Sequence, residues 1–92
     1  MLIMTKHYYR RFRQRVARAS AKRIRQFAER AFAYGTQLDE IKDENLLFWL
    51  RGRANTAGSM PRIYQNYVYW FQENRAVTIY LLPYEYRKVC EK

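Results

Sequence analysis

The spacing of apolar positions near the start of the chain predicts an amphipathic helix from Lys6 onward. Its apolar side carries four residues at helical spacing, namely Tyr8, Tyr9, Phe12 and Val16. Thr5 stands directly before this run and is a candidate N-cap. The opposite side of the helix carries a polar and basic row without any acid, formed by His7, Arg10, Arg11, Gln14 and Arg18.

The same helical spacing recurs twice more. A second helix is expected over residues 21–34, with Ser20 as its N-cap and Gly35 as its stop. Its apolar positions are Ile24, Phe27, Ala28 and Ala31, and its exposed side carries Lys22, Arg23, Gln26 and Arg30. A third, shorter helix is expected from Glu44, where Leu46, Trp49, Leu50 and Arg53 lie at helical spacing.

The last third of the chain changes to the composition of strands. Three runs rich in β-branched and aromatic residues cover residues 63–64, 67–72 and 76–82. Polar breaks at residues 65–66 and 73–75 predict tight hairpins between them, and Pro83 ends the third strand. The small residues between Gly52 and Pro61 predict a loop.

These elements predict an α+β fold in which two to three N-terminal helices cover one face of a C-terminal three-stranded antiparallel meander. At 92 residues the chain has room for one domain, residues 1–92. Its expected parts are a basic helical hairpin (1–35), an acidic loop with the third helix (36–60), and the sheet with its tail (61–92). The expected core residues are Phe12, Ile24, Phe27, Trp49, Leu50 and Val77.

The distribution of charge adds a prediction that the pattern of elements does not give, namely a negatively charged partner. The net charge is +10, and residues 1–30 hold ten Lys and Arg against Glu29 alone, which gives +9 for that third. Arginine predominates there, and its planar guanidinium suits phosphates and guanine edges. The residues expected to bind nucleic acid or another polyanion are Arg10, Arg11, Gln14, Arg15, Arg18, Lys22, Arg23 and Arg30.

Cysteine use and hydropathy bear on the compartment. Cys90 is the single cysteine, so no internal disulfide forms, and a reducing, cytoplasmic location is expected. The apolar run of residues 1–4 is far too short for a signal peptide, and no stretch approaches the length of a membrane span. We therefore expect no membrane partner.

Few catalytic sites are compatible with the residues present. The chain has one histidine, one cysteine and no HExxH, P-loop or GxGxxG motif, so neither a metal nor another cofactor is expected. The acidic cluster of Asp39, Glu40, Asp43 and Glu44 is better explained by capping of the third helix and by offsetting the basic helices than by metal binding.

Metal-independent cleavage of RNA is the reaction that these residues leave open, because the 2′-hydroxyl is an internal nucleophile and arginines stabilise the charged transition state. The side chains suited to it are His7, Arg11, Arg15, Tyr80 and Tyr86. His7 and Arg11 share one helical face, although a plain basic face is the better explanation of them. The aromatic residues of the predicted sheet are a further candidate, since aromatics stack on unpaired bases.

Three segments resemble a family of small phage and plasmid proteins that open with a T-K-H-A-x-x-R-x-x-x-R helix. They are residues 5–15, residues 62–64 and residues 76–83, whose V-T-I-Y run is similar to the family's closing strand. Tyr8 stands where that family has Ala. The group is similar to the RelE/BrnT toxin-like fold, and the resemblance implies a mobile-element origin and an RNA-directed ancestry.

Two classes of function follow. The first is a non-enzymatic protein that occupies RNA, less readily DNA, or the nucleic-acid channel of a host nucleoprotein complex, for instance as an anti-CRISPR-like inhibitor of RNA-guided defence. The second is a RelE/BrnT-like toxin endoribonuclease, an mRNA interferase, for which an acidic antitoxin would be the protein partner. The absence of a second histidine or a placed carboxylate beside His7 favours the first class.

Overall fold

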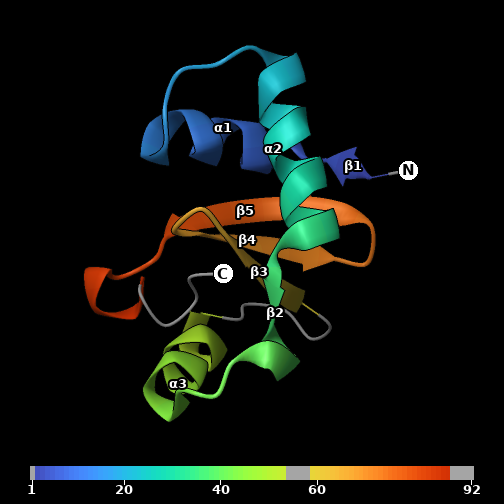
Figure 1. Cartoon of the computed structure of the whole chain (residues 1–92). Coiled ribbons are helices and arrows are strands. Elements are labelled where there is room, and N and C mark those ends of the chain that lie inside the picture. Colours follow the sequence, from blue (N-terminus) through green and yellow to red (C-terminus); the bar gives the residue numbers. More distant parts are fainter. Residues whose placement is uncertain (1, 54–58, 88–92) are drawn as a thin grey trace.

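The computed structural model describes residues 2–53 and 59–87 of the chain (Figure 1). The helices are α1 (Lys6–Arg15), α2 (Ala21–Tyr34) and α3 (Glu44–Arg53), with short 3-10 turns η1 (Leu38–Glu40) and η2 (Tyr84–Tyr86). The strands are β1 (Ile3–Met4), β2 (Thr36–Gln37), β3 (Ser59–Tyr64), β4 (Tyr67–Gln72) and β5 (Arg75–Leu81). The expected α+β class is confirmed.

The sheet has five strands in the order β1-β5-β4-β3-β2, so the prediction of three strands was incomplete. The three predicted strands form its antiparallel centre. β1 adds in parallel to β5, and β2 adds antiparallel to β3. Each of these edge strands has two residues, which is too short to produce a period in the sequence.

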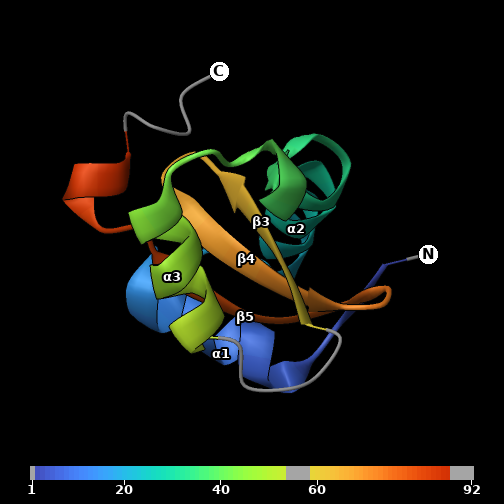
Figure 2. The same cartoon turned by 90° about the horizontal axis from the view of Figure 1, so that it is seen from below.

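Helices cover both faces of the sheet, not one face as predicted (Figures 1 and 2). Tyr69 and Phe71 of β4 pack with α1 and α2, whereas Val68 and Trp70 pack with α3. Successive side chains of a strand point to opposite faces, so the continuously apolar β4 requires cover on each side. The third helix supplies the second cover.

The first two helices begin at the capping residues that the sequence predicts. The Thr5 hydroxyl accepts a hydrogen bond from the Tyr8 amide and donates one to the Ala76 carbonyl, which attaches the start of α1 to β5. Ser20 caps α2 through the Arg23 amide. α1 lies along the sheet while α2 crosses it, so the two do not form the expected helical hairpin (Figure 1).

Gly35 ends α2 as predicted, but its φ of −64° requires no glycine. A Cβ atom at this position would lie 2.5 Å from the Ala31 carbonyl oxygen and 3.0 Å from the Cβ of Arg62. A side chain here would therefore clash with the last turn of α2 and would also crowd β3. Close packing, and not a left-handed turn, explains this glycine.

β3 begins earlier than the sequence indicates, because Ser59 and Pro61 belong to the strand and not to the preceding loop. Pro61 lies opposite Trp70 of β4, whereas β2 pairs only with Arg62 and Ile63. The outer side of β3 thus has no strand partner at Pro61 among the described residues. A proline without an amide hydrogen is tolerated at such an edge.

An irregularity in β5 changes the expected core. Trp70 pairs with Thr78 and Phe71 pairs with Ala76, which leaves Val77 as an extra residue in a bulge. Val77 is only half-buried and belongs to neither core cluster, so this core prediction was wrong. Phe27 and Trp49 are half-buried and pack against the edges of the two clusters, so these predictions are confirmed only in part. The predictions for Phe12, Ile24 and Leu50 are confirmed, because these residues are buried.

Candidate nucleic-acid interface

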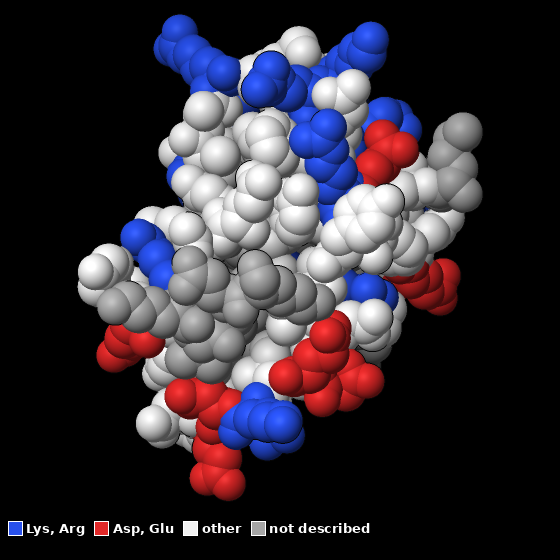
Figure 3. All heavy atoms as spheres, in the orientation of Figure 1, with Lys and Arg blue, Asp and Glu red and all other residues white. Residues whose placement is uncertain are grey.

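Positive charge gathers at one end of the molecule, over α2 and the segment that joins it to α1 (Figure 3). Acidic side chains gather in the lower half of the same view, around α3 and η1. Glu29 is the single acid of α1 and α2. In the part of the chain that the structure describes, no carboxylate forms an ion pair with the cations of these two helices.

One flank of α1 forms a groove with the start of α2. The groove has a volume of about 550 Å³ and is lined by Lys6, Tyr9, Arg10, Arg13, Gln14 and Ala21. The three cations that line it, Lys6, Arg10 and Arg13, lie at helical spacing along α1, so their charges form a row. The guanidinium carbon of Arg13 lies 5.9 Å from the centre of the Tyr9 ring. This flank presents an unneutralised cationic row beside an aromatic ring.

The first turn of α2 adds to the same positive region. It contains Lys22 and Arg23 and no acidic residue. Cations at a helix N-terminus are opposed by the helix dipole, and an anion there is stabilised by the dipole and by free amide groups. A bound phosphate would relieve this repulsion.

The other flank of α1 carries His7 and Arg11. Arg11 donates from Nε to Nε2 of His7 over 3.4 Å and from Nη1 to Oε1 of Gln14 over 3.1 Å. Desolvation, followed by the charges of the nearby arginines, lowers the pKa of His7 below its ordinary value of 6.5. The lowered pKa favours the uncharged imidazole, and this form allows Nε2 to accept from Arg11.

Arg15 turns from α1 toward the free edge of β5. Its Nη1 donates to the carbonyl of Ile79 over 2.7 Å, and its guanidinium carbon lies 4.4 Å from the centre of the Tyr80 ring. Arg53 of α3 reaches the same ring from the opposite side of the sheet, with its guanidinium carbon at 5.7 Å. Arg15 thus satisfies an edge carbonyl and also contributes to a cationic cluster around Tyr80.

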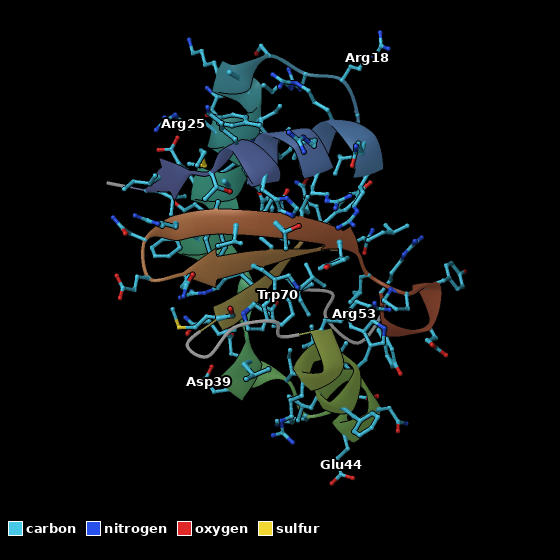
Figure 4. All side chains as sticks on the ribbon, turned by 180° about the vertical axis from the view of Figure 1, so that it is seen from behind. Arg18, Arg25, Asp39, Glu44, Arg53 and Trp70 are labelled. Atoms are coloured by element: carbon cyan, nitrogen blue, oxygen red, sulfur yellow. The ribbon has the colours of Figure 1, made fainter. Side chains whose placement is uncertain are left out.

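The predicted binding residues therefore divide into separate groups. Arg10 and Gln14 line the α1 groove, whereas Arg11 and Arg15 occupy the other flank. Arg18 lies in the connection between α1 and α2 and points away from the body of the molecule, and Arg30 is exposed on α2 (Figure 4). Lys22 and Arg23 lie at the start of α2, as described above.

Sequence reasoning missed three cations of this surface, Lys6, Arg13 and Arg53. The first two were detectable, because residues 6, 10 and 13 follow the helical spacing i, i+4, i+7. Arg53 belongs to a helix on the other face of the sheet, and its approach to Tyr80 depends on the tertiary structure. No local pattern in the sequence indicates that contact.

The acidic cluster has a structural role at two of its positions. Oδ1 of Asp43 accepts a hydrogen bond from the Leu46 amide at the start of α3, so the predicted capping is confirmed. Glu40 accepts from the Gln37 amide in the capping box of η1. Within residues 2–53 and 59–87, no three His, Cys, Asp or Glu side chains lie close enough to hold a metal ion.

The aromatic residues of the sheet are mostly turned inward. Tyr69, Trp70 and Phe71 are buried, and Tyr64, Tyr67 and Tyr80 are half-buried. The strongly exposed aromatic residues lie on helical elements instead, namely Tyr34 on α2, Phe48 on α3 and Tyr84 on η2. Tyr86 is half-buried beside the α3 core. The most exposed aromatic rings therefore lie on α2, α3 and η2 and not on the sheet.

None of the described helices has both the length and the apolar content to cross a bilayer. Cys90 lies outside the described residues. Comparison of the chain with models of known protein families, with curated proteins and with solved structures finds no match. The likeness to small phage and plasmid proteins and to the RelE/BrnT fold therefore stays a prediction.

Proposed function

We propose that this protein is a non-enzymatic nucleic-acid binder that acts by occupying RNA or DNA, or the nucleic-acid channel of a host nucleoprotein complex. The observation that carries the proposal is the cationic groove of α1, where Lys6, Arg10 and Arg13 form a row without a neutralising carboxylate among the described residues. Self-repulsion of this kind destabilises a free protein, and a polyanion relieves it.

RNA is the favoured ligand. Arginines predominate over lysines on this surface, and aromatic rings lie beside them at Tyr9 and Tyr80. Guanidinium groups bind phosphates and stack on bases, and aromatic rings accept the splayed bases that are typical of single-stranded RNA. Inhibition of an RNA-guided defence complex is one setting in which such occupancy would act, as an anti-CRISPR protein does.

The direct test is binding of a labelled single-stranded RNA to the purified protein at several salt concentrations. Each neutralised phosphate releases counterions, so the logarithm of the association constant should fall linearly with the logarithm of the salt concentration. Tight binding with a steep slope is the expected result. Absence of RNA and DNA binding at low salt would exclude the proposal for free nucleic acid, and copurification from host cells would then test the nucleoprotein form.

A second candidate is a metal-independent endoribonuclease of the RelE/BrnT kind, with an acidic antitoxin as its partner. The observation that favours it is the position of His7, Arg11, Arg15 and Tyr80 along one flank of α1 and the adjoining β5 edge. Against it, Nε2 of His7 accepts a hydrogen bond from Arg11, and desolvation and the surrounding arginines lower the pKa of His7, which disfavours the imidazolium that a general acid requires.

We expect His7→Ala to leave RNA binding nearly unchanged, because a neutral imidazole adds little beside so many arginines. A nuclease would instead lose cleavage by about 10²–10⁴-fold while keeping its affinity. The measurement is incubation with labelled RNA, with and without ribosomes, followed by a denaturing gel. Specific cleavage by the wild type that vanishes in His7→Ala would establish the endoribonuclease instead.

A further inference from the structure

A second groove lies on the outer side of α3, away from the α1 groove. It has a volume of about 340 Å³ and is lined by Asn45, Phe48, Trp49, Gly52, Arg53 and Tyr86. Phe48 is 80% exposed, although it is a large apolar side chain in the middle of a well-formed helix. Three aromatic rings, one amide and one guanidinium in a single groove match the chemical character of a nucleobase with its phosphate.

Gly52 keeps this groove open. Among the described residues, no atom lies within 4 Å of the place that a Cβ atom at Gly52 would take. The described part of the fold would therefore accept a larger side chain here without a clash. Glycine also weakens a helix relative to alanine, so it does not stabilise α3. Its effect is to leave bare the stretch of α3 between Phe48 and Arg53.

Cation–ring contacts connect this groove with the flank of α1 that carries His7, Arg11 and Arg15. The guanidinium carbon of Arg53 lies 5.0 Å from the centre of the Trp49 ring and 5.7 Å from that of Tyr80. Arg15 approaches the same Tyr80 ring at 4.4 Å from the α1 side. A strand of nucleic acid that leaves the flank of α1 at Arg15 therefore reaches Arg53 and the aromatic groove directly across the edge of β5.

Charge along α3 gives the bound nucleotide a direction. Arg53 lies at the end of α3 next to the sheet, while Glu44 lies at the far end (Figure 4). Asp43 precedes that far end, and Glu85 neighbours Tyr86. A phosphate is attracted at Arg53 and repelled toward Glu44, whereas an uncharged base is indifferent to these carboxylates. The phosphate thus belongs at Arg53 and the base over Phe48 and Trp49.

We propose that the α3 groove binds an unpaired nucleobase of single-stranded RNA whose phosphate is held by Arg53 and Arg15. This inference rests on the proposed RNA-binding function and adds to it the place where an unpaired base is bound. Bases in a duplex are stacked on one another and present no free ring face, so a duplex of the same length would gain nothing from the groove.

The first test uses the fluorescence of Trp49. The chain has two tryptophans, and the Nε1 atom of the other, Trp70, is buried without a hydrogen-bond partner in the described structure, so Trp70→Phe breaks no hydrogen bond. In this variant Trp49 is the only fluorescent indole. Stacking of a base should quench its emission when single-stranded RNA is added, and inorganic polyphosphate should leave the emission unchanged. Equal responses to both polyanions would overturn the proposal.

The second test needs no change in the core. Phe48→Ala should weaken binding of single-stranded RNA by about 5- to 160-fold, which is the range for loss of one stacked base, and should leave binding of inorganic polyphosphate unchanged. The matched control is Tyr34→Ala, which removes an aromatic side chain of 73% exposure from α2. Gly52→Ala should raise the melting temperature and still weaken RNA binding, because its methyl group enters the groove.

The outcomes separate this inference from the proposed function. If the wild type binds both RNA and polyphosphate, and Phe48→Ala and Tyr34→Ala bind RNA as the wild type does, the base-binding groove is wrong while the polyanion surface stands. If single-stranded and duplex RNA lose affinity equally in Phe48→Ala, base recognition is also excluded. If the wild type binds no RNA in any form, this inference is overturned together with RNA as the ligand.

Discussion

Phe12→Ala is expected to lower the free energy of unfolding by about 3–5 kcal/mol, which approaches the whole stability of a small domain. Phe12 is 1% exposed and lies between α1, α2 and the sheet. Its ring centre is 6.2 Å from that of Tyr8 and 5.6 Å from that of Phe27. Truncation leaves a cavity that these rigid rings fill poorly. Urea denaturation followed by circular dichroism measures the change.

Phe27→Ala is the matched control, because it removes the same side chain from the neighbouring position. Phe27 is only half-buried at the edge of the same cluster, so its loss should cost less, about 1–2 kcal/mol. Equal losses in the two variants would contradict the packing described here. A Phe12→Ala protein with the denaturation midpoint of the wild type would contradict it outright.

The second large effect is expected in the α1 groove. Replacing Lys6, Arg10 and Arg13 together with Ala should weaken binding of single-stranded RNA by about 10²-fold at about 0.1 M salt. The slope of the salt dependence should fall by about 2, since each phosphate contact on a single strand contributes about 0.7. Fluorescence anisotropy over a salt series measures both quantities in one experiment.

A control of equal charge separates the groove from net charge. Lys42, Arg51 and Arg75 are exposed and do not line the α1 groove, so their joint replacement by Ala removes the same three charges elsewhere. This variant should bind RNA nearly as the wild type does, apart from a small long-range effect that salt screens. If both triple variants lose affinity and slope alike, binding depends on net charge and the groove has no special role.

Local patterns were sufficient for the helices and for most of the cations. Thr5 and Ser20 begin their helices where the spacing of apolar residues predicts, because caps and helical periodicity act within a few residues of the chain. The concentration of charge in residues 1–30 likewise needs no structure. These features determined where the first two helices begin and that they carry a cationic surface.

Only the tertiary structure decided how that surface is divided. The helical period places Arg11 and Arg15 on one flank of α1, but the contact of Arg15 with Ile79 joins residues 64 positions apart. Two other features also depend on segments far apart in the sequence. β1 pairs with β5, and the position of α3 on the second face of the sheet brings Arg53 to Tyr80. Pairing between distant segments depends on closing long loops and on packing, and neither leaves a period in the sequence.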